Sequence, residues 1–224
     1  MRAPAHREDK VLTRRQDEAG ASVDRRQQVL EAARAAIAEY GLSNVRMAHI
    51  AERSGMSAGH ILYYFKTKDR ILVETLRWSE AESRQQWQAE LAKIEDAAER
   101  LAHFLDFYVP SGPRDPTWAL WVEVYGMALA SPEIVRGLEE LDQAWHDTLE
   151  EIVALGIRQG QFRAVDVVEF ADRFIALING YAIRITVGDP RLDRDGLLRR
   201  AISTAAGELG VPPSRLRVDG DSSA

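Results

Sequence analysis

Apolar residues recur every three or four positions along most of the chain, which is the repeat of an amphipathic helix. Gly and Pro stand between these stretches, and Gly41, Pro110 and Gly160 are placed to end helices. No stretch shows the strict alternation of a half-buried strand, so the pattern predicts an all-α fold of about nine helices. The expected helices span residues 22–40, 46–53, 58–65, 68–94, 95–109, 117–130, 133–160, 167–187 and 196–210.

The helices at 46–53 and 58–65 are short and separated by a tight turn. Gly55 suits the left-handed backbone that ends a helix, and Ser57 suits the position that caps the next one. Two short helices joined in this way are typical of a helix-turn-helix. The chain therefore divides into an arm at 1–21, a three-helix helix-turn-helix domain at 22–67, a larger helical domain at 68–210, and a flexible tail at 211–224.

Residues 55–59 also spell G-x-S-x-G, the nucleophile elbow of a serine hydrolase. That elbow needs a strand before its serine, whereas Met47, Ile50 and Ala51 have helical spacing. The five histidines are scattered among helical stretches. We therefore expect no enzyme, no cofactor and no metal site, and keep a serine esterase that uses Ser57 as the alternative.

The helix at 58–65 has an inner and an outer face. Ile61 and Phe65 lie four residues apart and face inward. The outer face is small, polar and aromatic and is followed by lysines, which suits a helix that enters the DNA major groove. The alternative is that the tyrosines pack on the next helix. The candidate DNA contacts here are Ser57, Ala58, His60, Tyr63, Tyr64, Lys66 and Lys68.

The net charge of −6 is unevenly distributed. Residues 1–70 hold 13 Lys and Arg against 9 Asp and Glu, a balance of +4, and the rest holds 16 against 26, a balance of −10. Positive charge thus accompanies the candidate DNA-binding helix. The chain has no Cys, and its first twenty residues lack the apolar run of a signal peptide or membrane anchor. We expect a soluble, cytoplasmic protein that does not bind membranes.

Aromatic residues gather in two expected helices of the larger domain. Trp118, Trp121 and Tyr125 share one face, and two carboxylates nearby, Asp106 and Glu123, could make an aromatic wall attractive to organic cations. The alternative is that these aromatic side chains form a hydrophobic core and that both carboxylates face solvent. Acidic stretches such as "LEELDQ" are expected on solvent faces. The candidate effector residues are Phe104, Phe107, Tyr108, Trp118, Trp121, Glu123 and Tyr125.

The helix at 167–187 is apolar around most of its girth, so it needs partners on two sides. A second copy of the chain could be one of them, which predicts a twofold dimer through the last two helices. Burial within one subunit is the alternative. The expected interface residues are Phe170, Phe174, Ile178, Ile185, Leu198, Ile202 and Ala205.

The stretch "IAERSGMSAGHILYYFKTKDRIL", followed by a wholly helical body, resembles the TetR family of transcriptional regulators. Leu62 departs from the family pattern, because many members have a DNA-contacting tyrosine there. The resemblance implies a third helix in the major groove, with Ala58 and His60 nearest the bases, Tyr63, Tyr64 and Lys68 on phosphates, and Arg46 as a further contact.

The stretch "TWALWVEVYGMALASPEI" and residues near 180 are similar to a BetI-type regulatory domain. The family resemblance implies a homodimer on a palindromic double-stranded DNA operator, released by a small-molecule effector. We expect a ligand-responsive regulator, a repressor, whose effector is a hydrophobic or cationic small molecule. An effector-independent dimeric scaffold is the remaining alternative.

Overall fold

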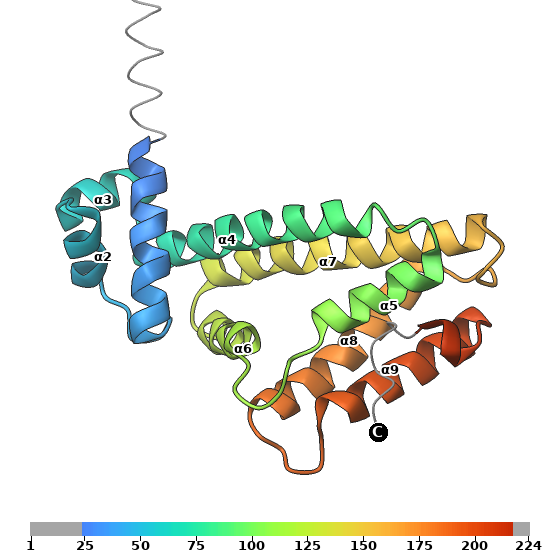
Figure 1. Ribbon diagram of the computed structural model, residues 1–224. Helices are drawn as coiled ribbons and strands as arrows, with labels where there is room; N and C mark the ends of the chain where they lie inside the picture. Colours follow the sequence, from blue (N-terminus) through green and yellow to red (C-terminus); the bar gives the residue numbers. More distant parts are fainter. Residues whose placement is uncertain (1–23, 217–224) are drawn as a thin grey trace, which may run out of the picture. The chain divides into compact units, whose positions relative to one another are not determined.

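Between residues 24 and 216, which the computed structural model describes, there are nine α-helices and no β-strand. The all-α prediction is confirmed. The expected arm at 1–21 and the end of the expected tail, 217–224, lie outside the described residues. The chain divides into two compact units, unit 1 up to Ser79 and unit 2 from Glu80 onward (Figure 1).

Unit 1 contains a first helix over residues 24–40, then α2 (Met47–Ser54), α3 (Ala58–Phe65) and the first half of α4 (Lys68–Leu91). The division between the units falls inside α4, whereas the sequence placed it before residue 68. The reason is that the first turns of α4 bury Ile71 and Leu72 and bond to the first helix. The core of unit 1 includes Val29, Ala33, Ile37, Ile50, Ile61, Phe65, Ile71 and Leu72.

The turn between α2 and α3 has the geometry that its sequence predicts. Gly55 ends α2 with a φ of 65°, a left-handed conformation that favours glycine. Ser57 precedes α3 with extended backbone, and its Oγ accepts a hydrogen bond of 3.2 Å from the backbone N–H of His60. The serine therefore satisfies one of the free N–H groups at the start of the helix.

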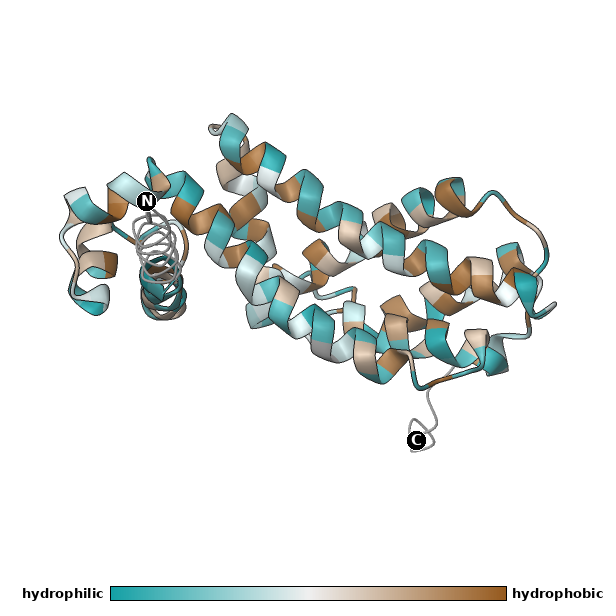
Figure 2. Cartoon of the chain, turned by 90° about the horizontal axis from the view of Figure 1, so that it is seen from above, coloured by the Kyte–Doolittle hydropathy of each residue, from teal (hydrophilic) through white to brown (hydrophobic). Residues whose placement is uncertain are grey.

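Unit 2 is a bundle of helices, and hydrophobic and hydrophilic residues alternate along most of them (Figure 2). Four of them begin at an aspartate that caps the helix, at Asp96, Asp115, Asp166 and Asp193. The helices are the second half of α4, α5 (Ala97–Tyr108), α6 (Pro116–Ala128), α7 (Pro132–Arg158), α8 (Val167–Thr186) and α9 (Arg194–Leu209).

The apolar residues of α8 are covered by neighbouring helices of the same chain. α8 contacts α6, α7 and α9. Five of the seven expected dimer residues have at most 1% of their surface exposed and cannot meet a partner: Phe170, Phe174, Ile178, Ile185 and Ala205. Their assignment to the interface was wrong, because α7 and α9 supply the second apolar surface. Leu198 and Ile202 remain partly exposed on α9.

The chain after α9 is more ordered than the expected tail. Val211 and Leu216 are buried, and residues Pro213–Leu216 form a short 3₁₀ helix, η1, against α5 and α9. Arg215 pairs with Asp96 at 2.6 Å. Two apolar anchors and an ion pair thus hold residues 211–216 on unit 2. In residues 24–216, no helix is long and apolar enough to cross a membrane.

Gly156, in the last turn of α7, is packed against a buried ring. A Cβ at this position would lie 2.1 Å from Cδ2 of Phe162, which is 4% exposed and has no room to move aside. We expect Gly156→Ala to lower the free energy of unfolding by about 1–3 kcal/mol, the usual cost of overpacking. Chemical denaturation measures this change. The control is Gly126→Ala in α6, where no atom lies within 4 Å and Ala should not destabilise.

Candidate functional site

The outer face of α3 presents the side chains that the sequence selected for DNA. Tyr63 is 70% exposed, while Ala58, His60 and Tyr64 are partly exposed. The ring of Tyr64 lies 5.3 Å from that of His60 and 5.4 Å from that of Tyr63. Unit 1 thus brings these four residues together on one short helix, whose capped N-terminus holds Ala58 next to Ser57.

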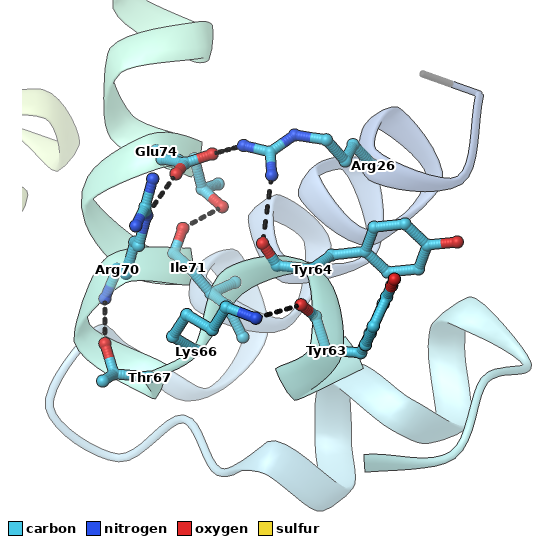
Figure 3. A network of polar contacts seen from close by, with 9 residues as sticks. Arg26, Tyr63, Tyr64, Lys66, Thr67, Arg70, Ile71 and Glu74 are labelled. Atoms are coloured by element: carbon cyan, nitrogen blue, oxygen red, sulfur yellow. Dashed lines mark hydrogen bonds and ion pairs between the residues drawn. The ribbon is translucent and has the colours of Figure 1, made fainter. Parts of the chain in front are cut away.

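Lys66 and Lys68 flank the junction between α3 and α4. Lys66 is exposed and directs its ammonium to the backbone carbonyl of Tyr63 at 3.0 Å, above that ring (Figure 3). Lys68 is partly exposed and is the first residue of α4. A positive charge at a helix N-terminus is unfavourable for the helix, so Lys68 does not serve local stability. Arg46 is exposed and stands at the N-cap position of α2, where its backbone N–H donates to Nδ1 of His49 at 3.2 Å.

Ser57 does not have the surroundings of a hydrolase nucleophile. The helix α2 precedes it, and its Oγ is engaged as the cap of α3. The strand and strained turn of a nucleophile elbow are therefore missing at this position. The resemblance of residues 55–59 to that motif follows from two glycines that a tight helix-turn-helix also uses.

Unit 2 contains two carboxylates set among aromatic rings. Glu80 on α4 accepts a hydrogen bond from Trp121 of α6, and Asp142 on α7 accepts one of 3.4 Å from the hydroxyl of Tyr125. The rings of Trp121 and Tyr125 are 6.2 Å apart. Tyr108 of α5 lies within electrostatic reach of both carboxylates. We call Glu80, Tyr108, Trp121, Tyr125 and Asp142 the acidic aromatic cluster.

Both carboxylates of the cluster are partly withdrawn from water. Burial raises the pKa of Glu80, against lowering by Arg84 and by the Trp121 hydrogen bond. Burial likewise raises the pKa of Asp142, against lowering by His146 and Tyr125. Holding two negative charges here costs free energy, and a bound cation would offset that cost.

The pKa values of the two phenols in the cluster are raised by burial and by the nearby carboxylates. Burial raises the pKa of Tyr125 to about 12, with further raising by Asp142. Burial also raises the pKa of Tyr108, whose hydroxyl donates to Oδ1 of Asn179 on α8 at 2.9 Å. Both phenols therefore stay neutral hydrogen-bond donors, and their ring faces supply the partial negative charge that attracts cations.

The expected effector residues differ in burial. Tyr108, Trp121 and Tyr125 belong to the acidic aromatic cluster, and the ring of Tyr108 also contacts those of Phe104 and Trp118, at 5.3 Å and 5.8 Å. Phe104 and Trp118 are buried in the core of unit 2, at 0% and 7% exposure, which is the core alternative considered from the sequence. Phe107 is 47% exposed and stacks on Trp87 at 4.7 Å.

The carboxylates bonded to these rings are not the two that the sequence suggested. Asp106 is exposed and forms an ion pair of 2.5 Å with Arg194. Glu123 follows Trp121 by two residues, which turns its side chain about 200° around α6 from that ring. Asp106 is thus engaged by Arg194 instead of by these rings, and Glu80 and Asp142 are the carboxylates that bond to Trp121 and Tyr125. The role of Glu123 stays a prediction.

Three residues at this site were not identified from the sequence: Glu80, Asp142 and Asn179. Asp142 lies in "LEELDQ", a stretch expected to face solvent, and the structure exposes Glu139 and Glu140 but not Asp142. The signal that could have identified it is its position beside Leu141 and one turn before Trp145, on the apolar side of α7. No comparable signal marks Glu80.

Two family models match this chain. The model of bacterial regulatory proteins of the TetR family matches residues 29–75, and the model of the C-terminal domain of BetI-type transcriptional repressors matches residues 97–209. The first range contains α2, α3 and most of the first helix. The second contains α5 to α9, including all residues of the acidic aromatic cluster except Glu80.

Individual relatives agree with these matches. The transcriptional regulator BetI of Brucella anthropi is 29% identical over 165 residues, 73% of this chain and 82% of that protein. A transcriptional regulator from Saccharomonospora viridis, solved in complex with choline, is 31% identical with a TM-score of 0.67, covering 82% of this chain and 96% of that one. A TetR regulator from Haloarcula marismortui shares the fold, with 21% identity and a TM-score of 0.64 over 84% and 97% of the chains.

Proposed function

Because this chain belongs to the TetR family of transcriptional regulators and has a BetI-type C-terminal domain, we propose that it is a cytoplasmic homodimeric repressor released from its operator by a small organic cation. Choline is the cation we propose to test first. The observation that carries the effector class is the pair of recessed carboxylates, each hydrogen-bonded to an aromatic residue of α6.

The operator is proposed to bind at α3. Ala58 and His60, in the first turn, are placed to approach base edges in the major groove, where small and polar side chains at a helix start can enter. Tyr63, Tyr64, Lys66 and Lys68 follow toward the C-terminal end and supply hydroxyl and ammonium donors for phosphates. Arg46 and the capping Ser57 are proposed as further backbone contacts.

A dimer is proposed because two copies of α3 must read two half-sites. A palindromic operator requires recognition helices about 34–36 Å apart, or a multiple of that distance. The outer faces of α8 and α9, rather than their buried sides, are the proposed interface. Ala176 and Gly180 are exposed four residues apart on α8, and Leu198 and Ile202 are partly exposed on α9. Small residues at this spacing allow a second helix to approach closely.

The acidic aromatic cluster is proposed as the effector site. A quaternary ammonium group carries charge but no N–H donor, so it is best recognised by ring faces together with nearby carboxylates. Trp121, Tyr125 and Tyr108 supply rings, and Glu80 and Asp142 supply charge. The choline in the Saccharomonospora viridis relative supports this class of ligand. Binding would favour one of two dimer geometries and thereby change operator affinity.

Selection of bound fragments from random DNA tests the DNA-binding part of the proposal. The purified protein, at near-physiological salt, should enrich a sequence with twofold symmetry. Tyr63→Ala with Lys68→Ala serves as the control for background enrichment. Enrichment no greater than that of the control would reject operator binding by α3.

Thermal melting distinguishes a choline-responsive regulator from an effector-independent scaffold. Choline raises the melting temperature only if it binds the native state, so a scaffold without an effector site would melt at the same temperature with and without choline.

The raised pKa values of Glu80 and Asp142 make stability and choline affinity depend on pH in opposite ways. Above the ordinary pKa range of carboxyls, the native state binds more protons than the unfolded state, so stability falls as pH rises through the raised values. Choline affinity should rise over the same range, because only the ionised carboxylates attract it. Melting curves across pH, with and without choline, measure both trends; parallel trends would contradict this assignment.

A further inference from the structure

The C-terminal end of α3 is held by two cationic side chains. A helix leaves its last four carbonyls without partners inside the helix, and here these belong to residues 62–65. The carbonyl of Tyr63 accepts from Nζ of Lys66 at 3.0 Å, and that of Tyr64 accepts from Nη1 of Arg26 at 3.2 Å. Arg26 comes from the first helix, 38 residues earlier, so it fixes the end of α3 from outside (Figure 3).

Arg26 is in turn held by α4. Its Nη2 donates to Oε2 of Glu74, while its guanidinium lies 4.6 Å from the ring centre of Phe65. The other carboxylate oxygen of Glu74 accepts from Nε of Arg70 at 2.9 Å. The side chain of Glu74 is only 16% exposed, which limits the screening of these charges by water. The planar fork of Arg26 therefore joins the first helix, α3 and α4 at one point.

The backbone between α3 and α4 is a tight turn with little conformational freedom. The N–H of Thr67 donates to the carbonyl of Phe65 at 2.9 Å, closing a γ-turn centred on Lys66. Lys66 has a φ of 70° and a ψ of −48°, which is the rare form of this turn and a strained conformation for a residue with a Cβ. Thr67 then caps α4 by accepting from the N–H of Arg70 at 3.1 Å.

We propose that Arg26 and Glu74 form a clamp that sets the position of the last turn of α3 for operator binding. They are positioning residues: the carboxylate of Glu74 would repel phosphate, and it reaches the last turn of α3 through Arg26. The clamp rests on the proposed DNA-binding role of α3. That turn carries Tyr63 and Tyr64, and contacts of this kind require placement to within about 0.5 Å.

The charge of Glu74 provides a test in which simple electrostatics and the clamp predict opposite results. Removing a negative charge from a DNA-binding unit should by itself tighten DNA binding. If the clamp positions α3, Glu74→Gln should instead weaken binding to the selected operator about tenfold, the loss expected from one charge-assisted hydrogen bond. The matched control is Glu52→Gln, which removes an exposed carboxylate of α2 and should leave affinity unchanged or tighter.

A second variant keeps the net charge constant. Arg26→Lys retains the positive charge, but one ammonium cannot reproduce the fork that reaches both Tyr64 and Glu74. It should weaken operator binding by a similar factor. The double variant, Arg26→Lys with Glu74→Gln, should bind the operator no more weakly than either single variant, because both changes break the same set of contacts.

Operator affinity and salt dependence, measured by fluorescence anisotropy together with thermal melting, decide the outcome. The clamp predicts weaker binding at temperatures where each variant remains folded. Binding by Glu74→Gln as tight as that of the unchanged protein would overturn the clamp alone, as would losses that merely follow the folded fraction. Failure of the unchanged protein to bind any selected DNA would reject the proposed function, and the clamp with it.

Discussion

Replacing Asp142 with Asn should weaken choline binding about 100-fold, since removing one partner of a recessed charge pair costs on the order of 3 kcal/mol. Asn keeps the shape of Asp and an oxygen that accepts from Tyr125, so the change removes mainly the charge. The free protein should be as stable as before or more stable, because an unfavourably buried charge is gone. Calorimetric titration and thermal melting measure the two effects.

The matched control is Asp106→Asn. Asp106 also lies in the effector domain, but it is exposed and paired with Arg194, so choline affinity should not change. A neutral compound of the same shape, 3,3-dimethyl-1-butanol, controls for the ligand charge and should bind weakly to every variant. Equal losses from Asp142→Asn and Asp106→Asn would mean that the acidic aromatic cluster is not the cation site.

Replacing Tyr63 and Lys68 together with Ala should weaken operator binding about 100-fold, through two contacts worth about tenfold each. Lys68→Ala should also lower the slope of log affinity against log salt by about 0.9, because one phosphate contact releases its counterion. Tyr63 is neutral, so its loss should leave that slope nearly unchanged. Anisotropy titrations at several salt concentrations separate the two contributions.

Stability offers an internal check on the Lys68 result. A positive charge at the start of α4 opposes the helix dipole, so Lys68→Ala should not destabilise unit 1. Weaker DNA binding therefore cannot be attributed to unfolding. Lys93→Ala is the control, since Lys93 is an exposed lysine paired with Glu90 in unit 2. An unchanged salt slope in Lys68→Ala would remove Lys68 from the phosphate contacts.

The helix-turn-helix could be predicted because short-range rules determine it. Gly55 ends α2 and Ser57 caps α3 through interactions within a few residues, and these depend little on the rest of the fold. Tyr63 and His60 could be placed on the outer face for the same reason. The clamp could not be predicted, since Arg26 and Glu74 are separated by 48 residues and no periodicity links them.

In the bundle of unit 2, hydrophobic periodicity alone could not predict which surfaces the helices pack against. The pattern of α8 correctly indicated two apolar contacts, but it could not say whether a neighbouring helix or a second copy supplies them. In the structure α7 and α9 do so, and Phe170 and Phe174 become core residues. Glu80 and Asp142 escaped notice for a related reason: a carboxylate on an amphipathic helix is partly buried only once the neighbouring helices are in place.

The most direct test of the central claim is the anisotropy of a labelled operator duplex bound to the protein during titration with choline. Choline should release the unchanged protein from the duplex, whereas 3,3-dimethyl-1-butanol should not, and Asp142→Asn should need about 100-fold more choline. An operator complex that saturating choline leaves intact would contradict control by this cation. Release of Asp142→Asn at the same choline concentration as the unchanged protein would contradict the site.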